Sequence, residues 1–190
     1  MSSPLTLAYR RRTLTLRAQT VRDLMRLWPA LDIRRLAETF PHWLVGASTI
    51  VGRDHRRAAE LGVMYAQAHR LAAGVEQVAI ELAPPPAPAK VATALRVTSV
   101  VAARRAIGAG KTPAAAMQSA FVQSSGAATR LALDGGRDTV ARSAPRYQRV
   151  TSGGSCDFCR MLAGRGAVYY SDTVGFRSHD WCACVSEPVY

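Results

Sequence analysis

The chain has 190 residues, of which 48% are hydrophobic and 20% are charged. A chain of this length can bury about two-thirds of its unfolded surface, so its size alone does not require a stabilising cofactor. Arginines interrupt the longest apolar runs well before the ~18 residues that a membrane span needs, so we expect no membrane-spanning helix. The first residues also lack the apolar stretch of a secretory signal peptide.

The formal net charge is +12 at pH 7, and it is spread unevenly along the chain. Residues 1–75 carry 12 basic and 5 acidic residues (+7), residues 76–150 carry 10 and 4 (+6), and residues 151–190 carry 3 and 4 (−1). A surface this basic attracts polyanions such as DNA or RNA. The alternative is that the arginines only solvate helix faces, and no motif for reading a base sequence is present.

Residues 4–29 are predicted to form a helix that opens at Pro4, where a missing N–H costs no hydrogen bond. The apolar residues that we expect on its buried stripe share three- and four-residue spacing: Leu7, Leu14, Ala18, Val21, Met25 and Trp28. A narrow stripe of this kind is typical of a helix that packs against other helices.

A break is predicted after this first helix, at Pro29. Asp32 can cap a short helical turn over 33–40, and Pro41 is expected to end that turn. A longer helix is then predicted over 42–73, because apolar residues keep helical spacing through it.

A proline-rich segment at 84–88 cannot continue a helix and is predicted to be a stiff linker. It divides the chain into an N-terminal helical region (1–83), a linker (84–90), a second helical region (91–146) and a C-terminal module (147–190). This division is the predicted domain organisation.

The second helical region is predicted to begin with a helix over 89–107. Thr112 is a suitable cap for the next helix, with Pro113 in its first turn, and that helix is expected to run toward residues 124–126. Another helical segment follows over 127–143. The Gly135-Gly136 pair inside it is predicted to mark a turn or a kink, since no Lys-Ser or Lys-Thr pair completes a phosphate-binding loop.

The composition changes after Pro145, where β-branched and aromatic residues occur in short runs between glycines. Strands are predicted over 147–151 and 183–190, with a short helical turn over 159–163. The predicted fold class is mainly α, with long amphipathic helices followed by a small α+β module that contains a short sheet or hairpin.

All four cysteines lie in this module, within a window of 29 residues. They occur as Cys156-x2-Cys159 and, after nineteen intervening residues, as His179-x2-Cys182-x-Cys184. Two sulfurs on one tight turn can bind a metal ion, and a second pair brought back by the chain completes a tetrahedron. The spacing therefore predicts a structural Zn²⁺ site. Disulfides are less expected without a signal peptide, and a redox-active pair would need a strand-to-helix setting.

The five candidate ligands exceed the four positions of a tetrahedral zinc site. One possibility is that Cys156, Cys159 and His179 bind together with one of the later cysteines. The other is that all four cysteines bind and His179 only donates a hydrogen bond to a ligand. In either arrangement protein atoms fill the coordination shell, which is typical of a structural site.

The order of these motifs resembles the carboxy-terminal module of the phage Mu F-like minor head proteins. In that family the second half is typically His-Pro-x-Cys-Arg-Cys, whereas this chain has His179-Asp-Trp-Cys182-Ala-Cys184. The run Gly166-Ala-Val-Tyr169 and the Leu-Asp-Gly-Gly-Arg run at 133–137 are similar to the variant in actinobacterial tailed phages, sometimes labelled capsid maturation protease.

The resemblance implies a structural minor capsid protein of a tailed bacteriophage that acts at or near the portal during head assembly. Its expected partners are the portal protein, the major capsid protein or both, and packaged double-stranded DNA through the arginine-rich helices; no membrane is expected. The implied location is the virion, in the capsid interior or at the portal vertex, after assembly in the host cytoplasm.

Two other functions compete with this expectation. A capsid maturation protease would need a nucleophile with a histidine base, and no recognisable nucleophile motif is present. A zinc-containing DNA-binding regulator would place its basic residues on the metal module, which carries a net charge of −1 instead. We therefore expect no enzymatic activity.

Overall fold

A computed structural model describes residues 3–151, 155–172, 176 and 178–190, so parts of the predicted C-terminal module lie outside the described residues. The elements in chain order are α1 (Pro4–Leu27), two 3-10 turns (Trp28–Ala30 and Ile33–Arg35), α2 (Leu36–Ala72), α3 (Pro88–Arg96), a π-helical turn (Val97–Val101), α4 (Ala102–Gly108), α5 (Pro113–Arg142), β1 (Arg146–Val150), α6 (Asp157–Gly164), β2 (Tyr169–Tyr170) and β3 (Val185–Val189). The predicted fold class is confirmed: the protein is mainly helical with a small C-terminal sheet.

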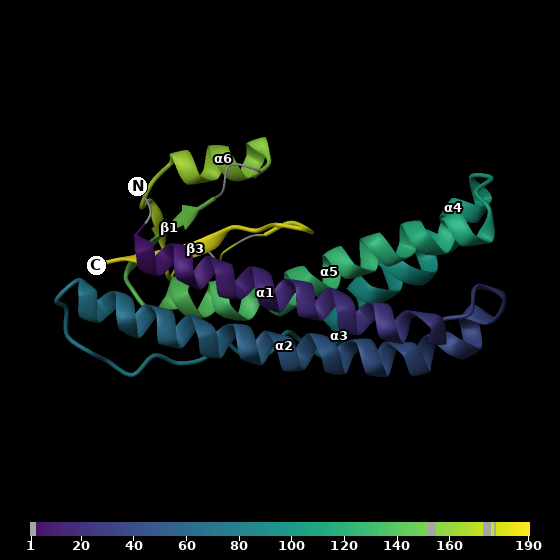
Figure 1. The fold of residues 1–190 in the computed structure, drawn as a ribbon, viewed down its shortest axis with the longest axis horizontal. Coiled ribbons are helices and arrows are strands. Elements are labelled where there is room, and N and C mark those ends of the chain that lie inside the picture. The colour runs from purple at the N-terminus through teal and green to yellow at the C-terminus, as the bar shows by residue number, and fades with distance from the viewer. Residues whose placement is uncertain (1–2, 152–154, 173–175, 177) are drawn as a thin grey trace.

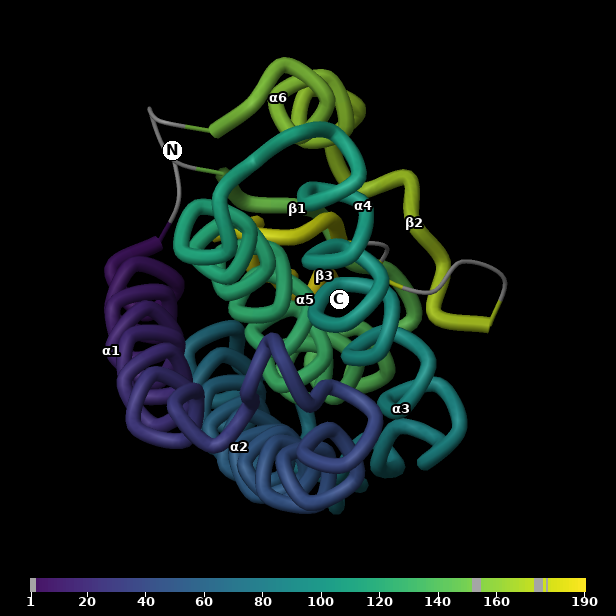
Figure 2. The backbone as a smooth tube through the Cα atoms, turned by 90° about the vertical axis from the view of Figure 1, so that its right-hand side faces the viewer, coloured from purple at the N-terminus to yellow at the C-terminus, as the bar shows by residue number. Residues whose placement is uncertain are grey.

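The helices α1, α2 and α5 run along the long axis of the molecule (Figure 1). Viewed from one end, α1, α2 and α3 lie around α5, which contacts each of them (Figure 2). The C-terminal module lies at one end of the body, and α4 lies at the other. Elements from both sides of the proline-rich segment thus pack together, and the predicted domain boundaries stay a prediction. No helix in the described part of the chain is long and apolar enough to cross a membrane.

Helix α1 begins as predicted, with the Ser3 hydroxyl accepting a hydrogen bond from the Thr6 backbone N–H. Its predicted buried stripe is wrong, because Leu7 and Met25 are 44% and 55% exposed. The buried residues of α1 are instead Thr6, Tyr9, Thr13, Leu16, Thr20 and Leu24.

The buried threonines of α1 have specific polar partners. Thr20 donates to the Asp54 carboxylate at 2.8 Å, and Thr6 donates to the Glu187 carboxylate at 2.9 Å. A buried hydroxyl with such a partner costs little, and its small side chain lets helices approach closely. The pattern of apolar residues could not reveal these contacts.

Helix α2 begins at Leu36 and continues through Pro41, so the prediction that Pro41 ends a turn is wrong. Pro41 lies near the start of the helix, where it removes one hydrogen bond, to the carbonyl of Ala37, and the first turn can adjust to the ring. Asp32 does cap a turn, the 3-10 turn Ile33–Arg35, by accepting from the Arg34 N–H at 2.8 Å.

Helix α5 is continuous from Pro113 to Arg142, so the predicted break near residues 124–126 and the predicted turn or kink at Gly135-Gly136 are both wrong. The two glycines face α2. A Cβ atom at Gly135 would lie 2.3 Å from the His55 carbonyl oxygen, and one at Gly136 would lie 2.7 Å from the Ala58 carbonyl oxygen. The glycines therefore allow the two helix backbones to touch.

The C-terminal sheet has the strand order β2-β1-β3, and both pairs of strands are antiparallel. The predicted strands at 147–151 and 183–190 correspond to β1 and β3, with Val150 opposite Val185. Tyr147 on β1 is buried against Phe176 and Cys159. The strand β1 therefore packs against the cysteine cluster through Tyr147.

Candidate metal centre

Each half of the cysteine motif forms a tight turn. Cys156 directly precedes α6, and its carbonyl accepts a hydrogen bond from the Arg160 N–H at 3.0 Å. The Cys182 N–H donates to the His179 carbonyl at 3.1 Å, and Trp181 between them has a φ of 63°. Few residues other than glycine adopt this left-handed conformation, so the second turn is held in place by its surroundings.

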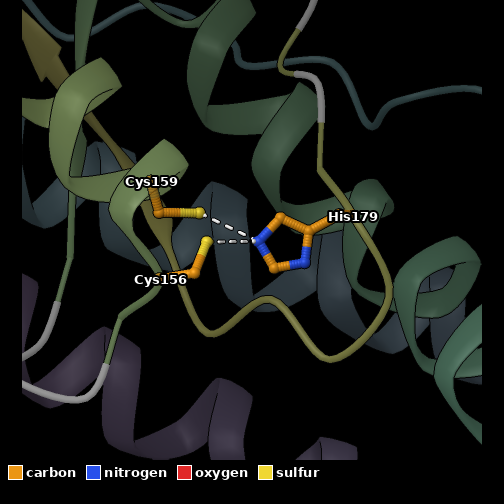
Figure 3. Close-up of side chains that lie close together, drawn as sticks. All are labelled: Cys156, Cys159 and His179. Carbon is orange, nitrogen blue, oxygen red and sulfur yellow. Dashed lines mark hydrogen bonds between the residues drawn. The ribbon is translucent and has the colours of Figure 1, made fainter.

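The two turns face each other across a small gap (Figure 3). The Nε2 atom of His179 lies 3.1 Å from the Cys156 sulfur and 3.1 Å from the Cys159 sulfur. The other ring nitrogen, Nδ1, lies 2.7 Å from the Asp180 carbonyl oxygen and donates to it. In a neutral ring with its proton on Nδ1, the lone pair of Nε2 faces the two sulfurs, which is the orientation of a metal-bound histidine.

A second group of sulfurs adjoins the first. The Cys159, Cys182 and Cys184 sulfurs all lie within 4.8 Å of one another, and the Cys159–Cys182 separation is 3.7 Å. Cys159 belongs to both groups, so all five predicted residues come together around it. The four cysteines are free thiols. The cluster could bind a metal ion such as zinc.

The separations can be compared with those of a tetrahedral zinc site. Bonds of about 2.3 Å to sulfur and 2.0 Å to nitrogen put two sulfurs about 3.8 Å apart, and sulfur and nitrogen about 3.5 Å apart. The Cys159–Cys182 pair at 3.7 Å matches. The two sulfur–nitrogen distances of 3.1 Å are a few tenths of an ångström short, so the gap would open slightly around an ion. Thiolates and imidazole are also the ligands that zinc prefers.

The protein environment separates the pKa values of the thiols. A hydrogen bond from the Cys184 thiol, supported by the charge of Arg137, lowers the pKa of Cys182 to about 4. The same pairing, together with burial, raises the pKa of Cys184. Burial raises the pKa of Cys159 to about 11, and the Cys159 backbone N–H lowers the pKa of the exposed Cys156 thiol. A bound cation would have to displace protons from those thiols that remain neutral.

Helix α5 supports the loop that carries His179, Cys182 and Cys184. The buried Arg137 donates from Nη2 to the Cys182 carbonyl at 2.7 Å and from Nε to the Cys184 carbonyl at 3.1 Å. One turn earlier, Asp134 accepts from Arg137 at 3.0 Å and from Ser178 at 2.6 Å. These bonds fix the backbone on which the later ligands lie.

The same side of α5 holds the turn around Trp181. Arg130 pairs with the Asp180 carboxylate at 2.8 Å. A Cβ atom at Gly126 would lie 2.7 Å from the Trp181 indole nitrogen, so only glycine leaves room for this ring. Sequence reasoning missed these supporting residues. The available signal was the presence of Arg130, Asp134 and Arg137 on one face of an otherwise alanine-rich helix.

Replacing Arg137 by methionine is expected to destabilise the protein by about 3 kcal/mol, because it leaves buried carbonyls and a carboxylate without their cation. The side chain of Arg137 is only 3% exposed, so water cannot take its place. Denaturant unfolding of the variant, with zinc present, measures the loss. Arg142→Met, at an exposed position of the same helix, should change stability by less than ~0.5 kcal/mol. Equal losses in both variants would contradict the role of Arg137.

A recess of the described structure lies elsewhere, between α1 and α2. It has a volume of about 500 Å³ and is lined by Arg12, Thr15, Leu16, Gln19, Arg57, Glu60, Leu61 and Met64. The lining contains no cysteine and no histidine. None of the five residues of the metal cluster therefore lines this recess.

Comparison with known proteins gives one finding about the family. The model of the VG15 protein family matches residues 3–190. No curated protein and no solved structure matched the chain. The resemblance to the phage Mu F-like minor head proteins is therefore wrong, since no model of that family matched. Short ligand spacings are imposed by the geometry of metal-binding turns, so unrelated families can share them.

Proposed function

The chain belongs to the VG15 protein family, and we propose that it is a non-enzymatic structural protein, a minor component of a tailed-phage head at or near the portal. The observation that carries this proposal is a closed cluster of metal ligands on a rigid body of long helices. The cluster offers enough protein ligands to fill a tetrahedral shell, which favours a structural role over a catalytic one.

The proposed ligands are Cys156, Cys159, His179 and Cys182, which hold one Zn²⁺ ion. His179 Nε2 lies against two sulfurs, which supports its place as a ligand. Cys182 is the better fourth ligand because it shares a hydrogen-bonded turn with His179 and lies 3.7 Å from the Cys159 sulfur. Cys184 then remains a buried neighbour whose thiol donates to the Cys182 sulfur.

A bound zinc ion would cross-link two segments of the chain and would not take part in catalysis. Its ligands come from the first turn of α6, including the capping residue Cys156, and from the loop before β3. The helix α6 contacts β1, and the loop is hydrogen-bonded to α5 and α1. The sheet and α6 bury few large side chains of their own, so metal ligation would contribute a large share of their stability. The module would thereby keep a fixed position on the end of α5.

The proposed partners are the portal protein, the major capsid protein or both, with the helical body as the docking element. A net charge of +12 favours a location beside packaged DNA, where an acidic protein would be repelled. Several exposed apolar side chains on the long helices, among them Val45 at 70% and Leu71 at 73%, are available for contact with a ring of subunits.

The proposal is tested on the phage that encodes the chain. Mass spectrometry of purified DNA-filled heads should find the protein at a low, fixed ratio to the major capsid protein. Deleting its gene should leave capsid precursor that does not mature into filled heads. Absence of the protein from purified heads, or normal heads without its gene, would refute the assignment. A zinc-to-protein ratio near zero in protein purified without chelator would refute the metal site alone.

A capsid maturation protease is the second candidate, because the exposed Cys156 sulfur lies 3.1 Å from His179 Nε2, as in a thiol protease. This function leaves Cys159, whose sulfur lies 3.1 Å from the same histidine nitrogen, and the neighbouring Cys182 without a role. Capsid precursor incubated with the purified protein separates the two functions. We expect no cleavage; specific cleavage that Cys156→Ala abolishes would establish the protease.

A zinc-containing DNA-binding regulator is the third candidate and has the least support. Such a protein would use its metal module to read DNA, but the segment 151–190 carries a net charge of −1. Strong preference for one duplex sequence in a competition assay would favour it.

A further inference from the structure

A run of basic residues without acidic neighbours in the sequence leads to the end of the body that lies opposite the metal cluster (Figure 1). The sequence has no acidic residue between Glu81 and Asp134. The basic residues in this interval are Lys90, Arg96, Arg104, Arg105, Lys111 and Arg130. All of them except Arg130 are exposed. Lys90 lies in the first turn of α3, whereas Arg96, Arg104, Arg105 and Lys111 follow from the last residue of α3 through α4 to the turn into α5; we call these last four residues the basic tip.

The side chains of the basic tip are unpaired, in contrast to many arginines elsewhere. Among the residues that the structure describes, none of the four forms an ion pair or a side-chain hydrogen bond. On α2, by comparison, Arg53 pairs with Asp23 and Asp54, and Arg56 pairs with Glu60. Internal contacts therefore do not account for the charge of the tip.

Arginines of the first helix are partly engaged in holding the C-terminal module. Arg10 donates to the Ala183 carbonyl at 3.3 Å, and Arg17 donates to the Trp181 carbonyl at 3.2 Å. On α1, Arg26 pairs with Asp23. Of the six arginines of α1, Arg11, Arg12 and Arg22 therefore remain without an ion pair or a side-chain hydrogen bond to any described residue, compared with all four residues of the basic tip.

The backbone that carries the basic tip is packed against α5. Helix α4 packs on α5 through Ala103 and Ala120, which are fully buried. The Thr112 hydroxyl caps the start of α5 at 3.3 Å from the Ala115 nitrogen. Figure 1 shows α4 and its turn into α5 projecting at the end of the body, and Figure 2 looks onto that end. The four cations are therefore presented together, on backbone that is already ordered.

We infer that the basic tip binds the phosphate backbone of double-stranded DNA, without preference for a base sequence. Three of the four cations are arginines, whose planar guanidinium groups match phosphate oxygens with paired hydrogen bonds. Arg96 and Arg104 are eight residues apart on one helical run, roughly 12 Å along its axis, so they reach different phosphates. Over residues 88–111 the exposed large aliphatic residues are Val97 and Ile107, ten positions apart, and single exposed residues of this kind are common on protein surfaces.

This inference rests on the proposed function, because a protein inside a filled head lies beside packaged DNA. The DNA binding itself can be measured with the purified protein. The zinc-loaded full chain is titrated onto a short, fluorescein-labelled DNA duplex of mixed sequence, and the anisotropy is followed between about 50 and 200 mM KCl. Four phosphate contacts predict that log K falls with log salt with a slope of about −3.6, at about −0.9 per contact.

The decisive variant is Arg104→Ala/Arg105→Ala, and its matched control is Arg11→Ala/Arg22→Ala on exposed positions of α1. Both remove two positive charges. The tip variant is expected to reduce the slope to about −1.8 and to weaken binding at least tenfold at the lowest salt, whereas the control should weaken it less than threefold. Circular dichroism and zinc content verify that both variants are folded.

Absence of salt-dependent binding, or equal losses in the two variants, would overturn the inference. Polyglutamate is also added as a competitor of the labelled duplex. If it displaces the duplex as effectively as unlabelled DNA at equal total charge, the result would overturn the inference in favour of an acidic protein partner. The tip variant should still be incorporated into heads at the wild-type ratio, so loss of DNA binding alone leaves the proposed structural function standing. Conversely, duplex binding by a protein that is absent from heads would refute that function and retain the DNA contact.

Discussion

Replacing Cys159 by serine is expected to abolish zinc binding and to unfold the C-terminal module while the long helices remain folded. Cys159 is 1% exposed and belongs to both groups of potential ligands, so no other sulfur can replace it. Loss of a structural zinc site removes on the order of 10 kcal/mol of apparent binding free energy from the segment that it cross-links. Zinc content and limited proteolysis of residues 143–190 measure the two effects.

The matched control for this prediction is Cys184→Ser, which changes a sulfur that is equally buried. Because Cys184 is placed beside the ion and not on it, this variant should keep one zinc per chain with weaker affinity. Its module should still resist proteolysis when zinc is in excess. Full zinc content in Cys159→Ser, or complete loss in Cys184→Ser, would contradict the proposed set of ligands.

Replacing Gly135 by alanine is expected to destabilise the helical body by about 3 kcal/mol, since overpacking at a backbone contact cannot be relieved by a side chain. The added Cβ would lie 2.3 Å from the His55 carbonyl oxygen, so α2 and α5 would have to separate. The change would also disturb His55, whose ring nitrogens lie 2.9 Å from the Leu131 carbonyl and 3.0 Å from the Pro84 carbonyl. Urea unfolding followed by circular dichroism measures the loss.

The control is Gly52→Ala, because Gly52 lies in α2 and an added Cβ there would meet nothing within 4 Å. Alanine is the better helix former by about 1 kcal/mol, so this variant should be slightly more stable than the parent chain. Opposite signs for two identical glycine-to-alanine changes would locate the close contact. A neutral Gly135→Ala would show that α2 and α5 are not in backbone contact.

Local signals in the sequence were sufficient for the fold class and for most boundaries of elements. Capping residues and prolines predicted the starts of α1 and α5, and β-branched residues predicted β1 and β3. The five metal-capable residues were found because their spacing is a local property of two turns. The spacing predicted that the two turns come together, but it did not predict which four of the five residues bind the ion.

The failures have a common physical cause, which is that the deciding contact lies far away in sequence. The threonines of α1 are buried because Asp54 and Glu187 satisfy their hydroxyls. The Gly135-Gly136 pair was predicted to mark a turn or a kink because the sequence of α5 alone does not show that the backbone of α2 packs directly against these two glycines. Arg137 was overlooked for the same reason, since the carbonyls that it binds are more than forty residues away.

The most direct test of the metal site is X-ray absorption at the zinc edge on the full-length protein. The account predicts one zinc per chain with three sulfur ligands at about 2.3 Å and one nitrogen ligand at about 2.0 Å, and with no oxygen ligand. Four sulfur ligands would remove His179 from the site. An oxygen ligand from water would open the shell and would contradict the structural role that is central to the proposed function.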